Sequence, residues 1–321
     1  MTTSQHKMTP TERVQAALIG EHVDRVPFCF WHHFKPEGSG TRMAELTLDF
    51  FRKKFDLDIV KIMPDLPYPA PEQTITHANQ WSSLPDLGLD TPMFQQQLIC
   101  IRWLRAQLGK DFPLILTIFS PLTQTFRFAG KTQAIAHARE NPLAFEQGLA
   151  TLATNLRLLA NAAVEAGASG IFFSSMGATN IDFTPLEYAR FGRPYDLKVL
   201  EGTKAGWLNI IHAHADPAQE DDDIYFENFI DYPVQVISWS DRLTGPSLRE
   251  AFTMTDKCLM GGLAERGPLT HGGETEIENE IMAAVTQTKG RKLILANGCS
   301  VPDDTQEEWL HVARKLVDQL K

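Results

Sequence analysis

The fold is decided by three consecutive segments: Leu114–Phe119 (LILTIF), Pro142–Glu165 (PLAFEQGLATLATNLRLLANAAVE) and Gly170–Ser174 (GIFFS). The first and third are short, nearly continuous apolar runs, which is typical of parallel strands that are covered on both faces. The middle segment places apolar residues three and four positions apart, which predicts a helix with one buried face. A strand, a helix and a second strand in this order form a parallel βαβ unit.

The same alternation continues along the chain. Eight segments are predicted as strands: Val26–His33, Asp58–Met63, Leu114–Phe119, Gly170–Ser174, Leu208–His214, Val234–Trp239, Cys258–Gly262 and Lys292–Ala296. Seven are predicted as helices: Met43–Phe55, Met93–Leu108, Pro142–Glu165, Pro185–Glu201, Pro246–Ala251, Glu274–Thr288 and Thr305–Lys321. Eight βα units in about 300 residues are typical of a (β/α)8 TIM barrel, so residues 1–321 are predicted to form a single α/β barrel domain. A doubly wound open sheet is the alternative, and the absence of G-x-G-x-x-G from the first βα turn weakens it.

Two segments add to this barrel. Thr9-Pro10-Thr11-Glu12 combines a hydroxyl cap, a first-turn proline and a glutamate, and therefore predicts an N-terminal helix. Leu66–Thr91 is rich in proline and polar residues, and we expect an extended loop after strand two that folds over the barrel mouth.

Composition narrows the functional classes. The 321 residues include 30 Lys plus Arg and 40 Asp plus Glu, for a formal charge of −10. A net negative chain without a basic run is a poor binder of nucleic acid, and no apolar run is long enough to span a bilayer. The run Asp216–Asp223 is expected to be a solvated acidic loop. The four cysteines form no C-x-x-C pair, and the polar start of the chain has no signal-like apolar core, so we expect a cytoplasmic protein with reduced thiols.

The ends of the predicted strands carry one set of metal-ligand side chains. His212 and His214 are two positions apart on strand five, so both imidazoles can face one centre. Cys299 follows strand eight and can reach the same mouth. Two histidines and one thiolate, with one position open, are typical of a catalytic zinc site. The alternatives are a pair of polar side chains at a loop edge and a small buried cysteine, the role we assign to Cys29, Cys100 and Cys258.

Other strand ends supply further candidates. Asp65 and Asp241 are strand-end carboxylates that could act as acid or base, or orient a histidine, although a helix cap or a solvated loop explains each equally well. Four more side chains near the mouth are candidate substrate contacts: His33, Ser175, Met176 and Asn297.

Several segments, in their order and spacing, resemble the uroporphyrinogen decarboxylase superfamily. The resemblance spans almost the whole chain and implies a single (β/α)8 barrel. It is carried by Met8–Val14 (MTPTERV), Asp24–Pro27 (DRVP), Gly261–Leu263 (GGL), Gly267–Leu269 (GPL), Gly272–Gly273 and Leu293–Pro302 (LILANGCSVP).

Two branches of that superfamily imply different chemistry. The decarboxylases carry an arginine-rich segment after strand one that holds a substrate with eight carboxylates. Here residues 31–37 read WHHFKPE, without arginine, although Asp65 falls near the catalytic aspartate of that branch. The chain is more similar to the methylcobamide:coenzyme M methyltransferases, which hold zinc with a His-x-Cys pair and a later Gly-Cys turn. His212 and Cys299 match the first and last of these ligands, while His214 replaces the middle cysteine.

The resemblance implies a zinc-dependent methyltransferase that moves a methyl group from a methyl-corrinoid protein to a small acceptor, with a thiol as the leading candidate. The chain has no Asp-x-His-x-x-Gly segment, so the corrinoid is expected to arrive on a partner protein. Decarboxylation of a tetrapyrrole or another carboxylated substrate is the first alternative. A non-catalytic barrel that binds a tetrapyrrole or corrinoid is the second. The expected partners are thus a small-molecule substrate and a corrinoid protein, with a homodimer left open.

Overall fold

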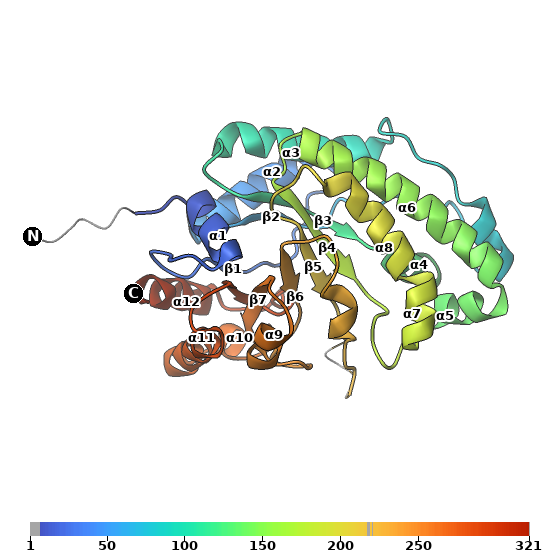
Figure 1. The fold of residues 1–321 in the computed structure, drawn as a ribbon. Helices are drawn as coiled ribbons and strands as arrows, with labels where there is room; N and C mark the ends of the chain where they lie inside the picture. The colour runs from blue at the N-terminus through green and yellow to red at the C-terminus, as the bar shows by residue number, and fades with distance from the viewer. Residues whose placement is uncertain (1–6, 217–218, 220, 321) are drawn as a thin grey trace, which may run out of the picture.

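The computed structural model describes residues 7–216, 219 and 221–320. The eight strands form one parallel sheet in the order β1-β8-β7-β6-β5-β4-β3-β2, which confirms the predicted α/β (β/α)8 barrel (Figure 1). The strands are β1 Phe28–Cys29, β2 Val60–Ile62, β3 Leu114–Phe119, β4 Gly170–Ser175, β5 Ile210–Ala213, β6 Val236–Ser238, β7 Cys258–Leu263 and β8 Leu293–Asn297. Glu220 of the predicted acidic run and Lys321 of the last predicted helix lie outside the described residues.

Helices surround the strands, with α3 and α6 beside β3 and with α9 and α11 beside β7 (Figure 1). The α-helices are α1 Pro10–Ile19, α2 Gly40–Leu48, α3 Pro92–Leu108, α4 Pro121–Ala129, α5 Lys131–Glu140, α6 Pro142–Glu165, α7 Pro185–Phe191, α8 Arg193–Leu200, α9 Leu248–Met254, α10 Pro268–His271, α11 Glu274–Thr288 and α12 Glu307–Gln319. Shorter turns are the π-helical η1 Asp49–Lys54 and the 3₁₀ turns η2 Ala78–Ser83, η3 Glu201–Thr203 and η4 Phe226–Phe229. None of the described helices has both the length and the apolar character needed to cross a membrane.

Local chemistry explains where the helices begin and break. Thr9 caps α1, and its hydroxyl and the Glu12 carboxylate satisfy each other's backbone N–H groups, as predicted. The predicted single helix Pro185–Glu201 is instead divided into α7 and α8 at Gly192. A Cβ atom at position 192 would lie 2.3 Å from the Tyr188 ring, so a larger residue there would clash with that ring. Helices α4 and α5 are not among the predicted elements.

The long loop Leu66–Thr91 is present, but its middle lies against helices rather than over the barrel mouth. Trp81 of η2 is fully buried, with its ring 5.4 Å from the ring of Phe145 on α6. Its indole N–H donates to Nδ1 of His137 on α5. The loop is therefore held outside the barrel by aromatic burial, which the proline-rich composition does not reveal.

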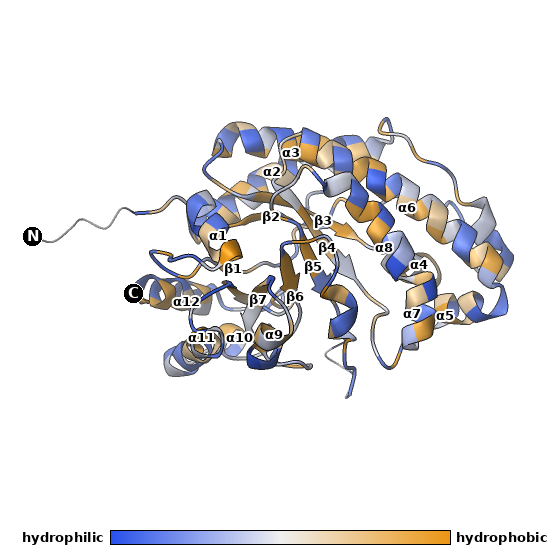
Figure 2. Cartoon of the chain, viewed as in Figure 1, coloured by the Kyte–Doolittle hydropathy of each residue, from blue (hydrophilic) through white to orange (hydrophobic). Residues whose placement is uncertain are grey.

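The core is the apolar interior and outer surface of the barrel. The strands are strongly apolar, and α6 alternates between apolar and polar residues around its circumference (Figure 2). Cys29, Cys100 and Cys258 are buried, as predicted, whereas Cys299 is only partly buried. The strands thus provide the rigid frame on which the side chains at their carboxyl ends are held.

Strands β1 and β2 stand at the two ends of the paired sheet order, and Asp58 joins them. The backbone N–H of Asp58 donates to the Phe28 carbonyl at 3.0 Å, and the Phe28 N–H donates to the Asp58 carboxylate at 2.8 Å. The same carboxylate accepts from Arg13 at 2.6 Å and from Arg25 at 2.5 Å. Asp58 is 1 % exposed and Arg13 is 2 % exposed, so this seam depends on a buried charge network.

Replacing Asp58 with Asn should strongly destabilise the fold. The change removes the buried counter-charge that Arg13 and Arg25 share and leaves them only the more exposed Asp24 and Asp318. Loss of one partner from a buried pair costs about 3–5 kcal/mol. Urea unfolding followed by circular dichroism measures the effect. The exposed Asp86→Asn variant is the control, with an expected change within about 0.5 kcal/mol. Equal stability of the two variants would contradict this role for Asp58.

Candidate functional site

A small cavity of about 150 Å3 lies at the carboxyl ends of the strands and collects several predicted site residues. His212 and His214 come from β5 and the turn after it, and Cys299 comes from the turn after β8. The lining residues are Trp31, His33, Lys61, Met63, Pro64, Thr117, Phe119, Phe172, Ser174, Met176, His212, His214, Cys299 and Ser300. The fold therefore brings all three proposed zinc ligands to one cavity, together with the predicted contacts His33 and Met176.

The strand frame orients the two histidines. His212 pairs in register with Ser174 of β4 and Ser238 of β6. Its Nδ1 lies 3.2 Å from the Ser238 hydroxyl, and its ring stacks on Phe172 at 5.1 Å between ring centroids. The His212 and His214 rings are 5.8 Å apart and nearly perpendicular. A second partner on the far ring nitrogen is the usual way in which a ligating histidine is oriented.

Burial controls the protonation of these side chains. It lowers the pKa of His212 well below its ordinary value, and the nearby charges of His214 and Lys61 act in the same direction. Burial also lowers the pKa of His214. Both imidazoles are therefore neutral near pH 7, which is the form that binds metal. Burial raises the pKa of the Cys299 thiol to about 11, so without a bound cation the sulfur stays protonated.

Glu265 is a neighbour of this set that the sequence prediction did not include. It is 1 % exposed, and one carboxylate oxygen accepts from the Ser240 hydroxyl at 2.9 Å. The other oxygen has no hydrogen-bond partner, and a Cβ atom on Gly298 would lie only 2.6 Å from it. The negative charge of Glu265 contributes to the raised pKa of Cys299. Its position just after β7 is a strand end, so the rule that located the other candidates also finds this one.

Lys61 is the second side chain that the sequence prediction did not include. It lies within β2, inside the barrel, and is 2 % exposed. Its ammonium group is 4.3 Å from the centroid of the Phe172 ring and 4.9 Å from that of Trp31. Burial lowers its pKa to about 7. A lysine in the middle of an otherwise apolar strand was the available signal.

The donor atoms suit zinc in their chemistry but are not gathered into a coordination site. Among the described residues, no three His, Cys, Asp or Glu side chains are arranged to hold a metal ion. Two buried donors nevertheless have no partner, namely Nδ1 of His214 and one oxygen of Glu265. Nitrogen, sulfur and carboxylate oxygen are the usual zinc ligands.

The two predicted catalytic carboxylates, Asp65 and Asp241, form hydrogen bonds with protein groups and do not line the inner cavity. Asp65 lies 2.6 Å from Nδ1 of His33 and also accepts from the Phe34 N–H at 2.6 Å. It therefore reaches the cavity through His33. Asp241 accepts from the Gly262 N–H at 2.7 Å and lines a different cavity, while burial raises its pKa to about 6. Asp241 is accordingly not placed to touch a molecule in the inner cavity.

Two predicted substrate contacts also point elsewhere. Strand β4 continues one residue beyond its predicted end, and Ser175 faces the surrounding helices, where Tyr188 and Asp196 are its hydrogen-bond partners. Its neighbour Ser174 lines the cavity instead. Asn297 is fully buried, and its amide donates to the carbonyls of Trp31 and Cys299. It holds the turn that carries Cys299 and does not line the cavity.

The family model described as "Uroporphyrinogen decarboxylase (URO-D)" matches residues 58–320, which is most of the chain. The chain belongs to the uroporphyrinogen decarboxylase family. This membership agrees with the observed barrel and with the resemblance seen in the sequence. No curated protein sequence is significantly similar to the chain.

Solved structures share the uroporphyrinogen decarboxylase family fold of this chain. A methyltransferase from Methanosarcina mazei superimposes with a TM-score of 0.75 at 19 % identity, over 97 % of this chain and 99 % of that one. A putative vitamin-B12-independent methionine synthase from Listeria monocytogenes gives 0.56 at 12 % identity, over 87 % and 86 %. A B12-independent methionine synthase from a Shewanella species, in complex with selenomethionine, gives 0.51 at 13 % identity, over 69 % and 66 %.

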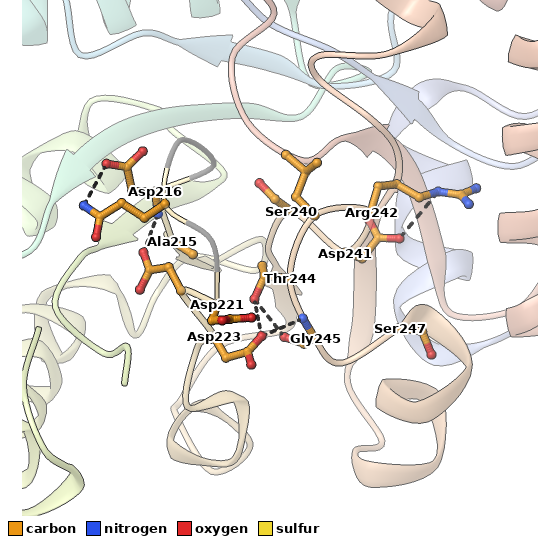
Figure 3. A pocket seen from close by; sticks show the side chains of 13 residues that line it. Ala215, Asp216, Asp221, Asp223, Ser240, Asp241, Arg242, Thr244, Gly245 and Ser247 are labelled. Atoms are coloured by element: carbon orange, nitrogen blue, oxygen red, sulfur yellow. Dashed lines mark hydrogen bonds and ion pairs between the residues drawn. The ribbon is translucent and has the colours of Figure 1, made fainter. Parts of the chain in front are cut away.

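A second, larger cavity of this uroporphyrinogen decarboxylase family member is acidic, whereas the lining of the inner cavity contains no carboxylate. It has a volume of about 730 Å3, and its lining includes Arg242 together with five aspartates: Asp216, Asp221, Asp222, Asp223 and Asp241. Figure 3 labels all of these except Asp222. Asp223 accepts from the Thr244 hydroxyl and the Gly245 N–H, which ties the acidic loop to the segment after β6. This concentration of carboxylates repels anions, so the larger cavity does not suit a polycarboxylate substrate.

The buried carboxyl group of Asp196, which accepts hydrogen bonds from Ser175, Tyr188 and Tyr232, should make the free energy of unfolding depend on pH. Asp196 is fully buried, and this raises its pKa to about 7 although hydroxyls of Tyr188 and Tyr232 donate to it. Because the folded pKa is raised, the stability from this group is complete below about pH 4 and is lost as the pH rises to about 7.

Asp196→Asn removes this dependence. Relative to the variant, the wild type should lose up to about 1 kcal/mol per pH unit between those limits. Urea unfolding at several pH values measures the difference. Asp86→Asn should keep the wild-type slope, and an unchanged slope in Asp196→Asn would contradict the assignment.

Proposed function

We propose that the protein is a zinc-dependent methyltransferase that methylates a small acceptor, with a thiol as the leading candidate. One observation carries the proposal: His212, His214 and Cys299 share a small cavity whose lining, among the described residues, contains no arginine and no carboxylate. Such a lining suits a metal-bound thiolate and does not suit a substrate with eight carboxylates. The methyltransferase of similar fold gives the class a structural precedent.

Residues of this chain would supply the zinc ligands and hold them in position. His212 and His214 supply neutral nitrogens, with His212 oriented by Ser238. Cys299 supplies sulfur from a turn that Asn297 holds, and Glu265 offers a buried oxygen beside that turn. When bound, zinc would lower the pKa of Cys299 and of an acceptor thiol, and so make the acceptor a nucleophile.

His33 is the residue placed to move a proton at the cavity. Its exposed imidazole lines the cavity, and its Nδ1 is held by Asp65 at 2.6 Å. A carboxylate on one ring nitrogen orients the other toward the reacting group. The proton that leaves the acceptor thiol would pass to this imidazole and then to solvent. Asp65 would act through His33 rather than on the substrate.

The methyl donor would remain outside the inner cavity. A cavity of about 150 Å3 falls below the roughly 300–1,000 Å3 of pockets that enclose drug-sized ligands, so a corrinoid could present its methyl group only from the mouth. We therefore propose that a partner protein carries the corrinoid. The same volume disfavours enclosure of a porphyrinogen, the substrate of the decarboxylase alternative.

Zinc analysis of the purified protein tests the ligand set. Wild type should hold about one zinc per chain. Cys299→Ala should weaken zinc affinity by more than the roughly 10–100-fold typical of changes outside the ligand shell. The same variant should lose methyl transfer from methylcobalamin to a small thiol.

Cys100→Ala is the matched control, because that cysteine is buried in α3 away from the cavity. It should keep both zinc and activity. A folded wild type purified without zinc would overturn the proposal, and turnover of uroporphyrinogen by zinc-free protein would overturn it in favour of decarboxylation.

A further inference from the structure

Lys61 is a buried basic side chain that forms no ion pair within the described part of the chain. Its one hydrogen bond within the described chain is to the thioether sulfur of Met63, at 3.1 Å. The rings of Trp31 and Phe172 stabilise the ammonium from two sides, but neither carries a negative charge. A lysine this deeply buried is usually paired. An anionic group on a molecule that enters the cavity would supply this partner.

Thr117 supplies a second, independent feature on the neighbouring strand. Lys61 pairs in register with Ile115 of β3, so Met63 and Thr117 lie level and face the same interior. Thr117 is 6 % exposed, lines the same cavity, and its hydroxyl has no hydrogen-bond partner. One amine, whose single hydrogen bond is to a weak thioether acceptor, and one hydroxyl without a partner thus face the same space.

We propose that Lys61 and Thr117 bind a single carboxylate or sulfonate group on the small molecule that occupies the inner cavity. The proposal rests on the proposed function only in taking that molecule to be the methyl acceptor. Lys61 is the one lysine or arginine among the residues that line this cavity, and the lining residues described include no carboxylate. One anionic group can therefore be neutralised, and several cannot.

Small probes without a thiol test this site separately from the zinc chemistry. Propanoate, ethanesulfonate and the neutral propanamide are titrated against chelator-treated protein by saturation-transfer NMR at about pH 6, below the lysine pKa. At least one anion should bind about tenfold or more tightly than the amide. Preference between the two anions identifies the headgroup.

Two variants assign the binding to the named residues. Lys61→Met should weaken anion binding about tenfold or more without changing amide binding, and Thr117→Val should weaken it by a few-fold. Lys204→Met removes an exposed lysine and should change nothing. Thermal unfolding shows whether each variant is folded. If Lys61→Met does not fold, Thr117→Val still tests the proposed site.

Failure of both anions to bind, equal binding of anion and amide, or full anion binding by folded Lys61→Met or Thr117→Val would overturn the inference. Each of these results leaves the zinc analysis untouched. Conversely, if the protein as purified contains no zinc and propanoate still binds through Lys61, the zinc ligand set is refuted and the anion site is supported.

Discussion

The buried ion pairs of Asp58 hold together the part of the barrel on which the site depends. Strand β1 is only two residues long, so its few backbone hydrogen bonds cannot by themselves fix the chain that follows. Asp58 fastens β1 to β2, and both arginines on its carboxylate come from residues before β1. The chain then delivers Trp31 and Lys61 to the interior from the two sides of this seam. The ion pairs of Asp58 thus anchor, before β2, the two strands that lead to His33 and Met63 in the inner cavity.

The protein separates its charges over a short distance. The chain has a net charge of −10, and five of its aspartates line the acidic cavity. The inner cavity beside it is lined instead by histidines, a cysteine and a lysine. Burial lowers the pKa values of His212 and His214 and lowers that of Lys61 to about 7, so these side chains contribute little charge to the interior. In the proposed function, the bound zinc and the anionic group of the acceptor would bring most of the charge into the interior. That arrangement favours a bound pair of opposite charges over either ion alone.

Much of this organisation can be predicted from the sequence, because buried parallel strands leave a clear apolar signal. The eight strands and the collection of His212, His214 and Cys299 at one cavity follow from that signal and from the rule that strand ends face one mouth. The rule fails where one residue decides the face. Ser174 and Ser175 lie on opposite faces of β4, and a strand that is apolar on both faces gives no signal for which of the two serines points inward.

Lys61 and Glu265 show a different limit. A charged residue within or just after an apolar strand conflicts with local propensity and so marks a position of interest, but the partners of each side chain appear only in the packed barrel. The position of the long loop after β2 is likewise tertiary, because it depends on Trp81 finding an aromatic pocket on α5 and α6. Composition alone cannot supply that partner.

The acidic cavity beside the entrance also has a kinetic consequence. Enzymes usually draw charged ligands in by a field of opposite sign, and added salt then slows association. Here the carboxylates of Asp216, Asp221, Asp222 and Asp223 line the cavity beside the inner one, so the proposed anionic ligand would approach through a repulsive field. At low ionic strength the Debye length is about 30 Å, and these carboxylates would hold the ligand away. Salt would therefore accelerate its arrival, so the association rate and the ionic strength should rise together.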